Sequence, residues 1–264
     1  MAQFIPADYR GRVVMDFADV DSAKFESYAD EGSGPMAWIN RREGRLLRAF
    51  EKTVAERADH SLFVSEAEAL LFRQRSGLSD EQVKAVGNGI DLEFYGAQDV
   101  EAEVSDNNGP LILFTGQMDY QPNVQAVQSF STEVMPDILA RFPMVGRAPT
   151  EKVTQLDGEN GTIVTGAVDD IRSWIMAADV VVAPLRIARG IQNKVLEAMA
   201  MAKPVVASAC AAEGIEATDG KHFLIAQSVA EEARLVCDLL GDAERAMQFG
   251  EQARILIHSH YSWE

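Results

Sequence analysis

Short apolar runs rich in β-branched residues alternate along the chain with longer segments of helical spacing. From residue 110 onward these runs are continuously apolar, which is typical of parallel strands that helices cover on both faces. The segments between them repeat apolar residues at helical intervals. Alternation of strands and helices predicts a doubly wound α/β fold with a parallel sheet. Strands are predicted at 12–17, 60–64, 84–88, 110–116, 141–146, 161–166, 179–185, 203–208 and 222–226.

One segment interrupts this alternation. Residues 89–109 are rich in Gly, Asp, Glu and Asn and contain few residues that form a core. We therefore predict a linker at 89–109, with a hinge that includes Asn88 and Gly89. It separates a first segment, 1–88, with about three strands from a second, 110–264, with about six.

Composition and charge narrow the functional classes. The chain has 264 residues, 24 Lys and Arg, 41 Asp and Glu, and a formal net charge of −17. This charge argues against a general nucleic-acid binder, because phosphates repel it. No apolar run approaches the ~20 residues of a membrane span, and the first residues lack the apolar core of a signal peptide. We expect a cytoplasmic protein, and two cysteines fit a reducing compartment.

The most informative stretch is PLRIARGIQNKVLEAMAMAKPVVAS, residues 184–208. A predicted strand ends at Pro184, a loop follows, and a helix begins near Ile191. The N-terminus of such a helix attracts phosphate groups, and Lys194 adds a positive charge. Glu197 follows one turn later and can accept hydrogen bonds from sugar hydroxyls. The alternative is a solvated Lys–Glu pair on a helix that merely packs against the sheet.

Several motifs in order resemble group 1 (family 4) glycosyltransferases of the GT-B architecture. They are DFADVDSAKF (16–25), FTGQMDYQPNVQAVQSF (114–130), VGRAP (145–149), VTGAVDDIRSW (164–174) and the GIQNKVLEAMAMAKPVV segment. The chain looks most similar to the sugar transferases of bacterial exopolysaccharide and PEP-CTERM systems. The resemblance implies two Rossmann-like domains and retaining transfer from a UDP or GDP sugar to a glycan or lipid-linked acceptor. It implies neither a bound metal nor a further cofactor.

The resemblance also implies roles for individual residues, although it assigns no catalytic residue. Glu197 would hold the ribose hydroxyls, and the segment 164–168, with Val164 and Gly166, would lie beside the nucleobase. Gly116, Gly146 and Arg147 would line the same cleft. The diphosphate would lie on the turn before the helix, at Gly190, Ile191, Gln192 and Asn193.

The sequence departs from the family pattern at three positions. Arg189 stands where the family has its first glutamate, and a cation cannot accept a hydrogen bond from a sugar hydroxyl. Gln117 and Pro122 occupy positions where the family usually has an arginine and a lysine. Lys194 and Arg189, together with Arg147, would then have to balance the diphosphate charge.

Two further patterns allow alternative interpretations. Asp19-Val20-Asp21 matches the Asp-x-Asp pair with which another class of transferases binds Mn²⁺ or Mg²⁺. A helix cap formed by Asp21 or Ser22 is the simpler interpretation.

Residues 39–54 predict a basic amphipathic helix, with net charge +3 over 39–52. It would contact an anionic membrane at its cytoplasmic face, or it is a surface helix whose arginines pair with acidic neighbours.

The position of DFADVDS so early in the chain predicts a partial N-terminal lobe on the acceptor side. In the resembled family much of a first domain precedes this motif, so the chain resembles an N-terminally truncated member. An exposed strand edge of such a lobe favours a homodimer, and catalysis by this chain alone would be weak. A naturally short enzyme, a non-catalytic protein that binds sugar nucleotides, and another GT-B enzyme such as a nucleotide-sugar epimerase remain alternatives.

Overall fold

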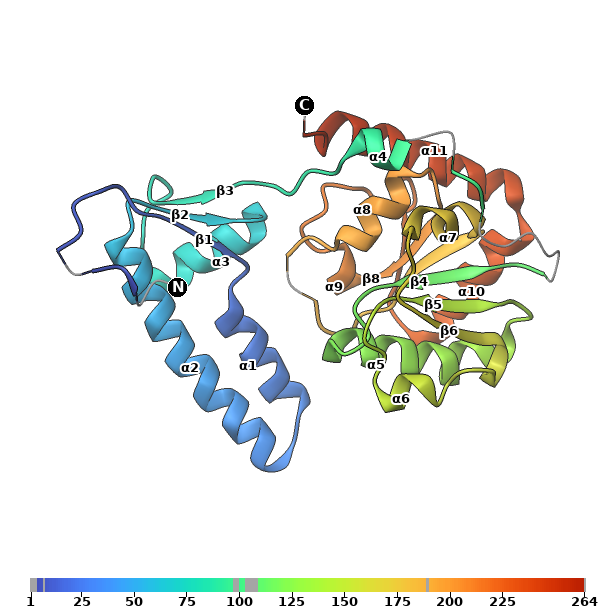
Figure 1. Cartoon of the computed structure of the whole chain (residues 1–264), viewed down its shortest axis with the longest axis horizontal. Coiled ribbons are helices and arrows are strands. Elements are labelled where there is room, and N and C mark those ends of the chain that lie inside the picture. Colours follow the sequence, from blue (N-terminus) through green and yellow to red (C-terminus); the bar gives the residue numbers. More distant parts are fainter. Residues whose placement is uncertain (1–3, 7, 97–99, 103–108, 189, 264) are drawn as a thin grey trace. The chain divides into compact units, whose positions relative to one another are not determined.

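The structure is a computed structural model that describes all residues except 1–3, 7, 97–99, 103–108, 189 and 264. The chain divides into two compact units (Figure 1). The first comprises Met1–Asn88 with Ile187–Ile191, and the second comprises Gly89–Arg186 with Gln192–Glu264.

The first unit is built around a parallel sheet of β1 (Val14–Ala18), β2 (His60–Phe63) and β3 (Val83–Ala85), in the order β1-β2-β3. The rings of Phe17 and Phe63 stack with their centroids 5.4 Å apart, and the ring centroids of Phe72 and Phe63 lie 4.7 Å apart. β1 and β3 are the edge strands of this sheet. The homodimer that the sequence analysis expects through an exposed strand edge stays a prediction. The helices of the first unit are α1 (Asp21–Glu31), α2 (Gly34–Arg57) and α3 (Glu66–Ser76).

The start of α1 corrects the expected cap. Val20 is the N-cap residue, and neither Asp21 nor Ser22 caps the helix through its side chain. Instead, two buried carboxylates from other helices accept hydrogen bonds from backbone N–H groups at the start of α1. Glu68 accepts the Val20 N–H at 2.6 Å, and Glu51 accepts the Ser22 N–H at 2.9 Å. The sequence pattern cannot reveal this, because the caps lie 29 and 48 residues away in the chain.

The second unit contains a six-stranded parallel sheet with the order β6-β5-β4-β7-β8-β9. Its strands are β4 (Ile112–Thr115), β5 (Phe142–Val145), β6 (Thr162–Gly166), β7 (Val180–Ala183), β8 (Val205–Ser208) and β9 (Leu224–Ala226). Its α-helices are α4 (Leu92–Gly96), α5 (Gln121–Ser129), α6 (Glu151–Thr154), α7 (Ile171–Ala177), α8 (Asn193–Ala200), α9 (Ala209–Ala212), α10 (Val229–Gly241) and α11 (Ala243–His260). The π-helix η2 (Phe130–Val134) and the 3₁₀ turns η3 (Met135–Asp137) and η4 (Glu159–Gly161) complete it.

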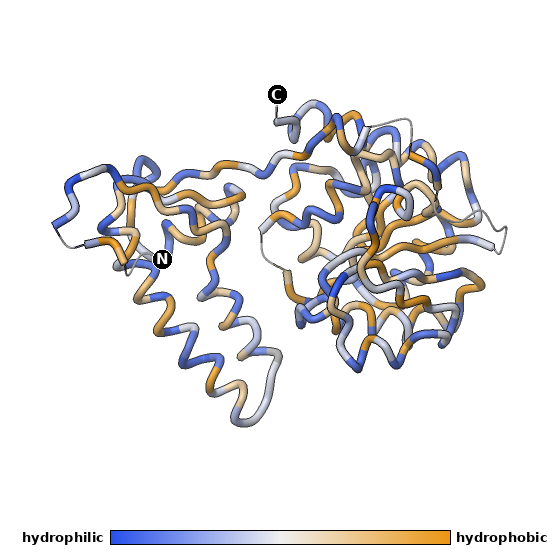
Figure 2. The backbone as a smooth tube through the Cα atoms, in the orientation of Figure 1, coloured by the Kyte–Doolittle hydropathy of each residue, from blue (hydrophilic) through white to orange (hydrophobic). Residues whose placement is uncertain are grey.

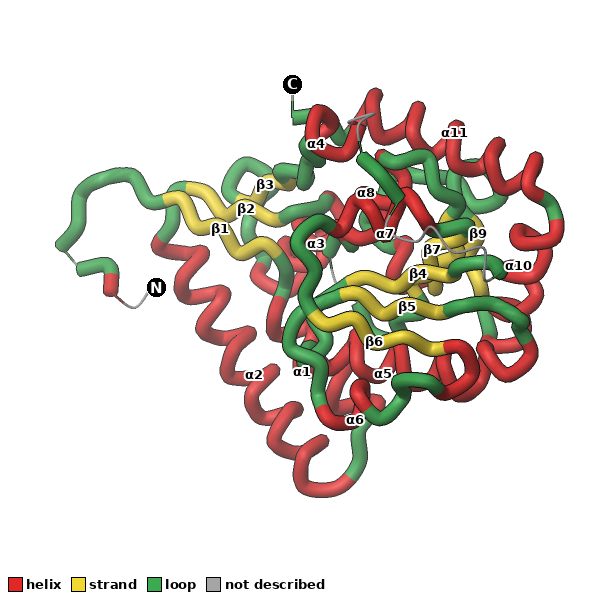
Figure 3. The backbone as a smooth tube through the Cα atoms, turned by 45° about the vertical axis from the view of Figure 1, so that its right-hand side comes forward, coloured by secondary structure: helices red, strands yellow, loops and turns green. Residues whose placement is uncertain are grey.

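Helices lie on both faces of this sheet (Figure 3), and its strands are largely hydrophobic (Figure 2). β4, β5 and β7 are buried at every position, as continuous apolar runs predict. Each of the nine predicted strands is present, so the predicted α/β fold with parallel sheets is confirmed. The strand order reverses between β4 and β7, and open α/β sheets bind ligands outside the carboxyl ends of strands at such a point.

The predicted linker has more structure than its composition suggested. Within 89–109 the chain forms α4, and the residues from Gly89 onward belong to the second unit. Ile90 donates its N–H to the Tyr261 carbonyl at 2.7 Å, and Asp91 accepts the N–H of Phe94 at 2.8 Å. The first bond ties the start of this segment to the C-terminal end of the second unit, and the second is a local turn that begins α4. Residues 97–99 and 103–108 of the predicted linker lie outside the described residues.

Candidate functional site

Three glycines lie at the carboxyl ends of neighbouring strands in the second unit. Gly116 follows β4, Gly146 follows β5, and Gly166 ends β6. The Gly146 N–H donates to the Gly166 carbonyl at 3.0 Å. A Cβ atom at Gly146 would lie 1.6 Å from the Gly116 carbonyl oxygen, so only glycine allows these loops to approach so closely.

Lys194 extends from the first turn of α8 toward the end of β4. Its Nζ donates to Asn123 Oδ1 at 2.8 Å and lies 4.0 Å from the centre of the Phe114 ring. A Cβ atom at Gly116 would lie 3.0 Å from this Nζ, so Gly116 forms the floor beneath the ammonium group. Burial lowers the pKa of Lys194 to about 7, which the charge of Glu197 partly opposes. An incoming anion would restore the full positive charge.

Glu197 lies one turn further along the same helix. Its carboxylate accepts a hydrogen bond from the Tyr95 hydroxyl of α4. Burial raises the pKa of Glu197, while this hydrogen bond and the charge of Lys194 lower it. A partly buried carboxylate beside a lysine can accept hydrogen bonds from the vicinal hydroxyls of a sugar.

The loop before α8 contains the other predicted residues of this motif. Gln192 is the N-cap residue of α8 and makes no capping hydrogen bond with its side chain. Asn193 begins the helix. Gly190 has a φ of +61°, a left-handed conformation that favours glycine, and with Ile191 it groups with the first unit. Arg189 lies outside the described residues.

Arg147 and Gln117 connect the loops after β4 and β5. Arg147 Nη2 donates to Gln117 Oε1 at 2.9 Å, and the Gln117 carbonyl accepts a hydrogen bond from Asn123 Nδ2 at 2.9 Å. Val164, in contrast, lies inside β6, and its N–H already donates to Asp157 Oδ1 at 2.9 Å. Of the segment 164–168, Gly166 is the residue at the strand's end.

The structure thus brings Gly116, Lys194 and Glu197 together within one unit. It adds Asn123 and Tyr95, which the sequence analysis missed. Asn123 directly follows Pro122 in the first turn of α5, and its burial is evident only in the folded chain, so its position along the chain offers no clear signal of this role. Tyr95 lies 102 residues before Glu197 in a segment predicted as linker, so no local pattern could pair them.

The arrangement can bind a ligand that carries both negative charge and hydroxyl groups. The first N–H groups of a helix point outward with the positive end of its dipole, and Lys194 stands beside them. Around the Asp19-Val20-Asp21 motif and elsewhere, the described residues include no cluster of three or more His, Cys, Asp or Glu side chains suited to bind a metal.

Comparison with known families identifies this second unit. Residues 109–242, just over half of the chain, match the family described as Glycosyl transferases group 1. The chain belongs to the group 1 glycosyltransferases. None of the curated proteins matches it in sequence.

Solved structures share the fold of this group 1 glycosyltransferase at low sequence identity. HepE from Anabaena, solved with UDP and glucose, has a TM-score of 0.73 at 17% identity, covering 95% of this chain and 68% of its own. Sucrose-phosphate synthase from Thermosynechococcus elongatus has a TM-score of 0.76 at 18% identity, with coverages of 97% and 65%. WaaG, a glycosyltransferase involved in lipopolysaccharide biosynthesis, has a TM-score of 0.73 at 17% identity, with coverages of 97% and 75%. The chain therefore spans about two thirds to three quarters of these proteins.

Proposed function

We propose that this glycosyltransferase moves a sugar from a nucleoside-diphosphate sugar, of the UDP or GDP type, to a glycan or lipid-linked acceptor. The transfer is retaining, needs no protein-bound metal, and belongs to bacterial exopolysaccharide synthesis. The observation that carries the proposal is the pairing of Lys194 and Glu197 on α8, at the carboxyl edge of the sheet where β4 and β7 are neighbours. In the proposed complex the diphosphate lies at the N-terminus of α8 beside Lys194, and the ribose lies on Glu197.

This arrangement suits the charge change of the reaction. Transfer breaks the bond between the anomeric carbon and the diphosphate oxygen and joins that carbon to an acceptor hydroxyl oxygen, which releases its proton. The leaving nucleoside diphosphate gains negative charge as its bond breaks. Dipoles and charges already aimed at that group stabilise it without reorganisation, and here the helix N-terminus and Lys194 supply them.

The test is a product assay with defined donors. UDP-glucose, UDP-N-acetylglucosamine and GDP-mannose are each incubated with the purified chain, with and without alkyl glycosides as acceptors, and followed by NMR. Transfer yields a glycoside with unchanged anomeric configuration and free nucleoside diphosphate. Epimerisation without acceptor, or binding of a donor without any product, would instead favour the two alternative functions.

The glycine beneath Lys194 provides a prediction for this donor site. A methyl group at Gly116 would lie 2.7 Å from Asn123 Nδ2 and 3.0 Å from Lys194 Nζ, so Gly116→Ala must displace one or both. We expect it to weaken UDP or GDP binding, measured by calorimetry, by about 10-fold. Gly158→Ala is the matched control, because Gly158 also has a positive φ, +83°, but has no atom within 4 Å of the added methyl. Equal losses in both variants would contradict the role of Gly116.

Helix α2 carries the proposed peripheral membrane contact. Ile39, Leu46 and Phe50 are 41%, 48% and 47% exposed, and their spacing places them on one face of the helix. Arg41, Arg42, Arg48 and Lys52 lie within 4 Å of carboxylates, as the surface-helix alternative expects. None of the helices in the described part of the chain has the length and apolar character needed to cross a bilayer. An exposed apolar stripe beside basic residues favours a contact at the membrane surface.

Vesicle flotation distinguishes these two interpretations of α2. We expect the chain to float with vesicles containing phosphatidylglycerol and not with pure phosphatidylcholine. Replacing Arg41, Arg42, Arg45 and Arg48 with alanine is expected to lower the bound fraction at least about 10-fold, because each basic residue near an anionic surface adds about 1 kcal/mol. Replacing Lys152, Arg234, Arg245 and Arg254 with alanine removes the same charge from the second unit as a control. Absence of flotation, or equal losses in both variants, would favour the surface-helix interpretation.

A further inference from the structure

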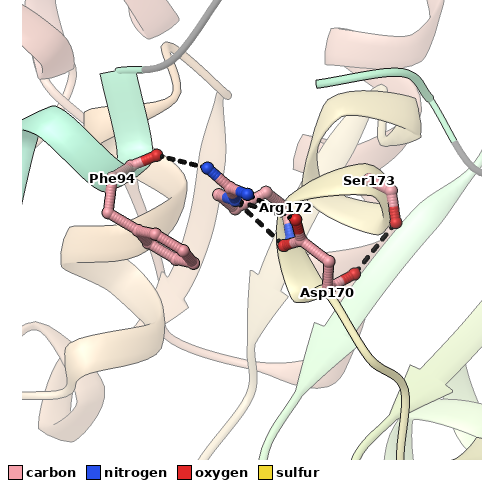
Figure 4. Close-up of polar contacts among 4 residues, drawn as sticks. All are labelled: Phe94, Asp170, Arg172 and Ser173. Atoms are coloured by element: carbon pink, nitrogen blue, oxygen red, sulfur yellow. Dashed lines mark hydrogen bonds and ion pairs between the residues drawn. The ribbon is translucent and has the colours of Figure 1, made fainter. Parts of the chain in front are cut away.

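Two of the five residues of the short helix α4 contact other helices of the second unit. Arg172 of α7 donates from Nη1 to the Phe94 carbonyl at 2.9 Å, and its guanidinium carbon lies 3.9 Å from the centre of the Phe94 ring (Figure 4). Helix α4 packs against α8, and this brings the hydroxyl of the next residue, Tyr95, to the Glu197 carboxylate. Helix α4 is therefore connected directly to the carboxylate of the candidate site within the second unit.

Arg172 is itself held in place. Asp170 accepts hydrogen bonds from Arg172 Nε at 2.9 Å and from Nη2 at 2.6 Å, and Asp170 also caps α7 by accepting the Arg172 N–H at 2.9 Å. The hydrogen bonds from Arg172 lower the pKa of Asp170, so the pair stays charged. A planar guanidinium held on two sides has little freedom, and the Phe94 carbonyl that it binds is correspondingly fixed. Tyr95 follows Phe94 within the same helical turn.

We propose that Tyr95 is a positioning residue, which orients the Glu197 carboxylate toward the ribose hydroxyls of a bound nucleotide through the hydrogen bond between their side chains. The inference rests on the proposed function, because it assumes that a nucleotide binds at Glu197. The inference adds Tyr95 of α4 to the proposed nucleotide site. The contacts of Asp170 with Arg172, and of Arg172 with Phe94, hold the segment that carries Tyr95 in place.

The chemistry of a carboxylate explains how Tyr95 and a ribose can share Glu197. An ionised carboxylate has about four acceptor positions, so one hydrogen bond from Tyr95 leaves room for two vicinal hydroxyls. A free glutamate side chain loses rotamer entropy when it binds a ligand. Tyr95 removes part of that cost before the ligand arrives, which is preorganisation. The same hydrogen bond favours the ionised form of Glu197, which burial disfavours.

The test compares nucleotides that differ only in their ribose hydroxyls. Binding of UDP and GDP, and of their 2′,3′-dideoxy counterparts, is measured by calorimetry for the wild-type chain and for Tyr95→Phe, which removes only the hydroxyl. For the nucleotide that the wild-type chain binds, we expect about 3- to 10-fold weaker binding of the ribose form. Binding of the dideoxy form should stay within about 2-fold, because it makes no hydrogen bond to Glu197.

Two further variants separate positioning from general stability. Tyr261→Phe removes the hydroxyl of a different, buried tyrosine of the same unit, which accepts the Glu216 N–H at 2.6 Å, and should change neither affinity. Arg172→Lys keeps the charge but loses the planar contact with Phe94, and should repeat the selective loss of Tyr95→Phe. Unchanged ribose-form affinity in Tyr95→Phe, or equal losses for both nucleotide forms, would overturn the positioning role. Absence of UDP and GDP binding by the wild-type chain would overturn the proposed function as well.

Discussion

Replacing Lys194 with alanine is expected to weaken the binding of UDP or GDP by about 100-fold. The substitution removes the only ammonium group that the described residues place between Asn123 and the Phe114 ring at the start of α8. A diphosphate bound there would lose a desolvated charge partner, and truncating one member of such a pair costs about 2–5 kcal/mol. Isothermal calorimetry with both nucleotides measures this loss directly.

Lys203→Ala is the matched control for this substitution. Lys203 is also a desolvated lysine with a lowered pKa, and its Nζ donates to the Met176 carbonyl at 2.7 Å. It follows the carboxyl end of α8, whereas Lys194 is in the first turn. We expect this variant to lose stability but to bind nucleotide like the wild type. Wild-type affinity in Lys194→Ala would show that the diphosphate is bound elsewhere.

Donor binding is expected to weaken as the pH rises above 7. In the free protein burial lowers the pKa of Lys194 to about 7, and a bound diphosphate raises it again because it favours the charged form. Below this pH the lysine is already protonated, so binding needs no proton. Above it, binding must take up a proton, and affinity falls by up to about 10-fold per pH unit.

Calorimetry with an intact nucleotide sugar at several pH values tests this expectation. An intact nucleotide sugar has no terminal phosphate that titrates in this range, so the lysine is isolated from changes in the ligand. Between pH 6.5 and 8.5 we expect about a 20- to 30-fold loss of affinity, with proton uptake visible as a dependence on the buffer's ionisation enthalpy. Lys194→Arg stays charged throughout and should lose this pH dependence. Equal affinity of the wild type at both pH values would contradict a desolvated lysine at the diphosphate.

The alternation of apolar runs and helical segments was sufficient to predict the architecture. Continuously apolar strands such as β4, β5 and β7 must be covered on both faces, and that requirement produces a parallel α/β sheet whatever the details of its loops. The motif around α8 likewise placed Lys194 and Glu197 on one helix, because residues three apart in a helix lie on the same side. These predictions depend on residues close together in the chain.

The contacts that complete the candidate site depend on residues far apart in the chain. Asn123 reaches Lys194 across 71 positions, and Tyr95 meets Glu197 only because α4 packs beside α8. The caps of α1 follow the same rule, since Glu51 and Glu68 approach it from other helices. A polar side chain takes whichever partner packing brings within about 3 Å, and sequence spacing does not determine that partner. Local periodicity therefore determined the elements and one face of α8, whereas tertiary packing decided which side chains surround Lys194 and Glu197.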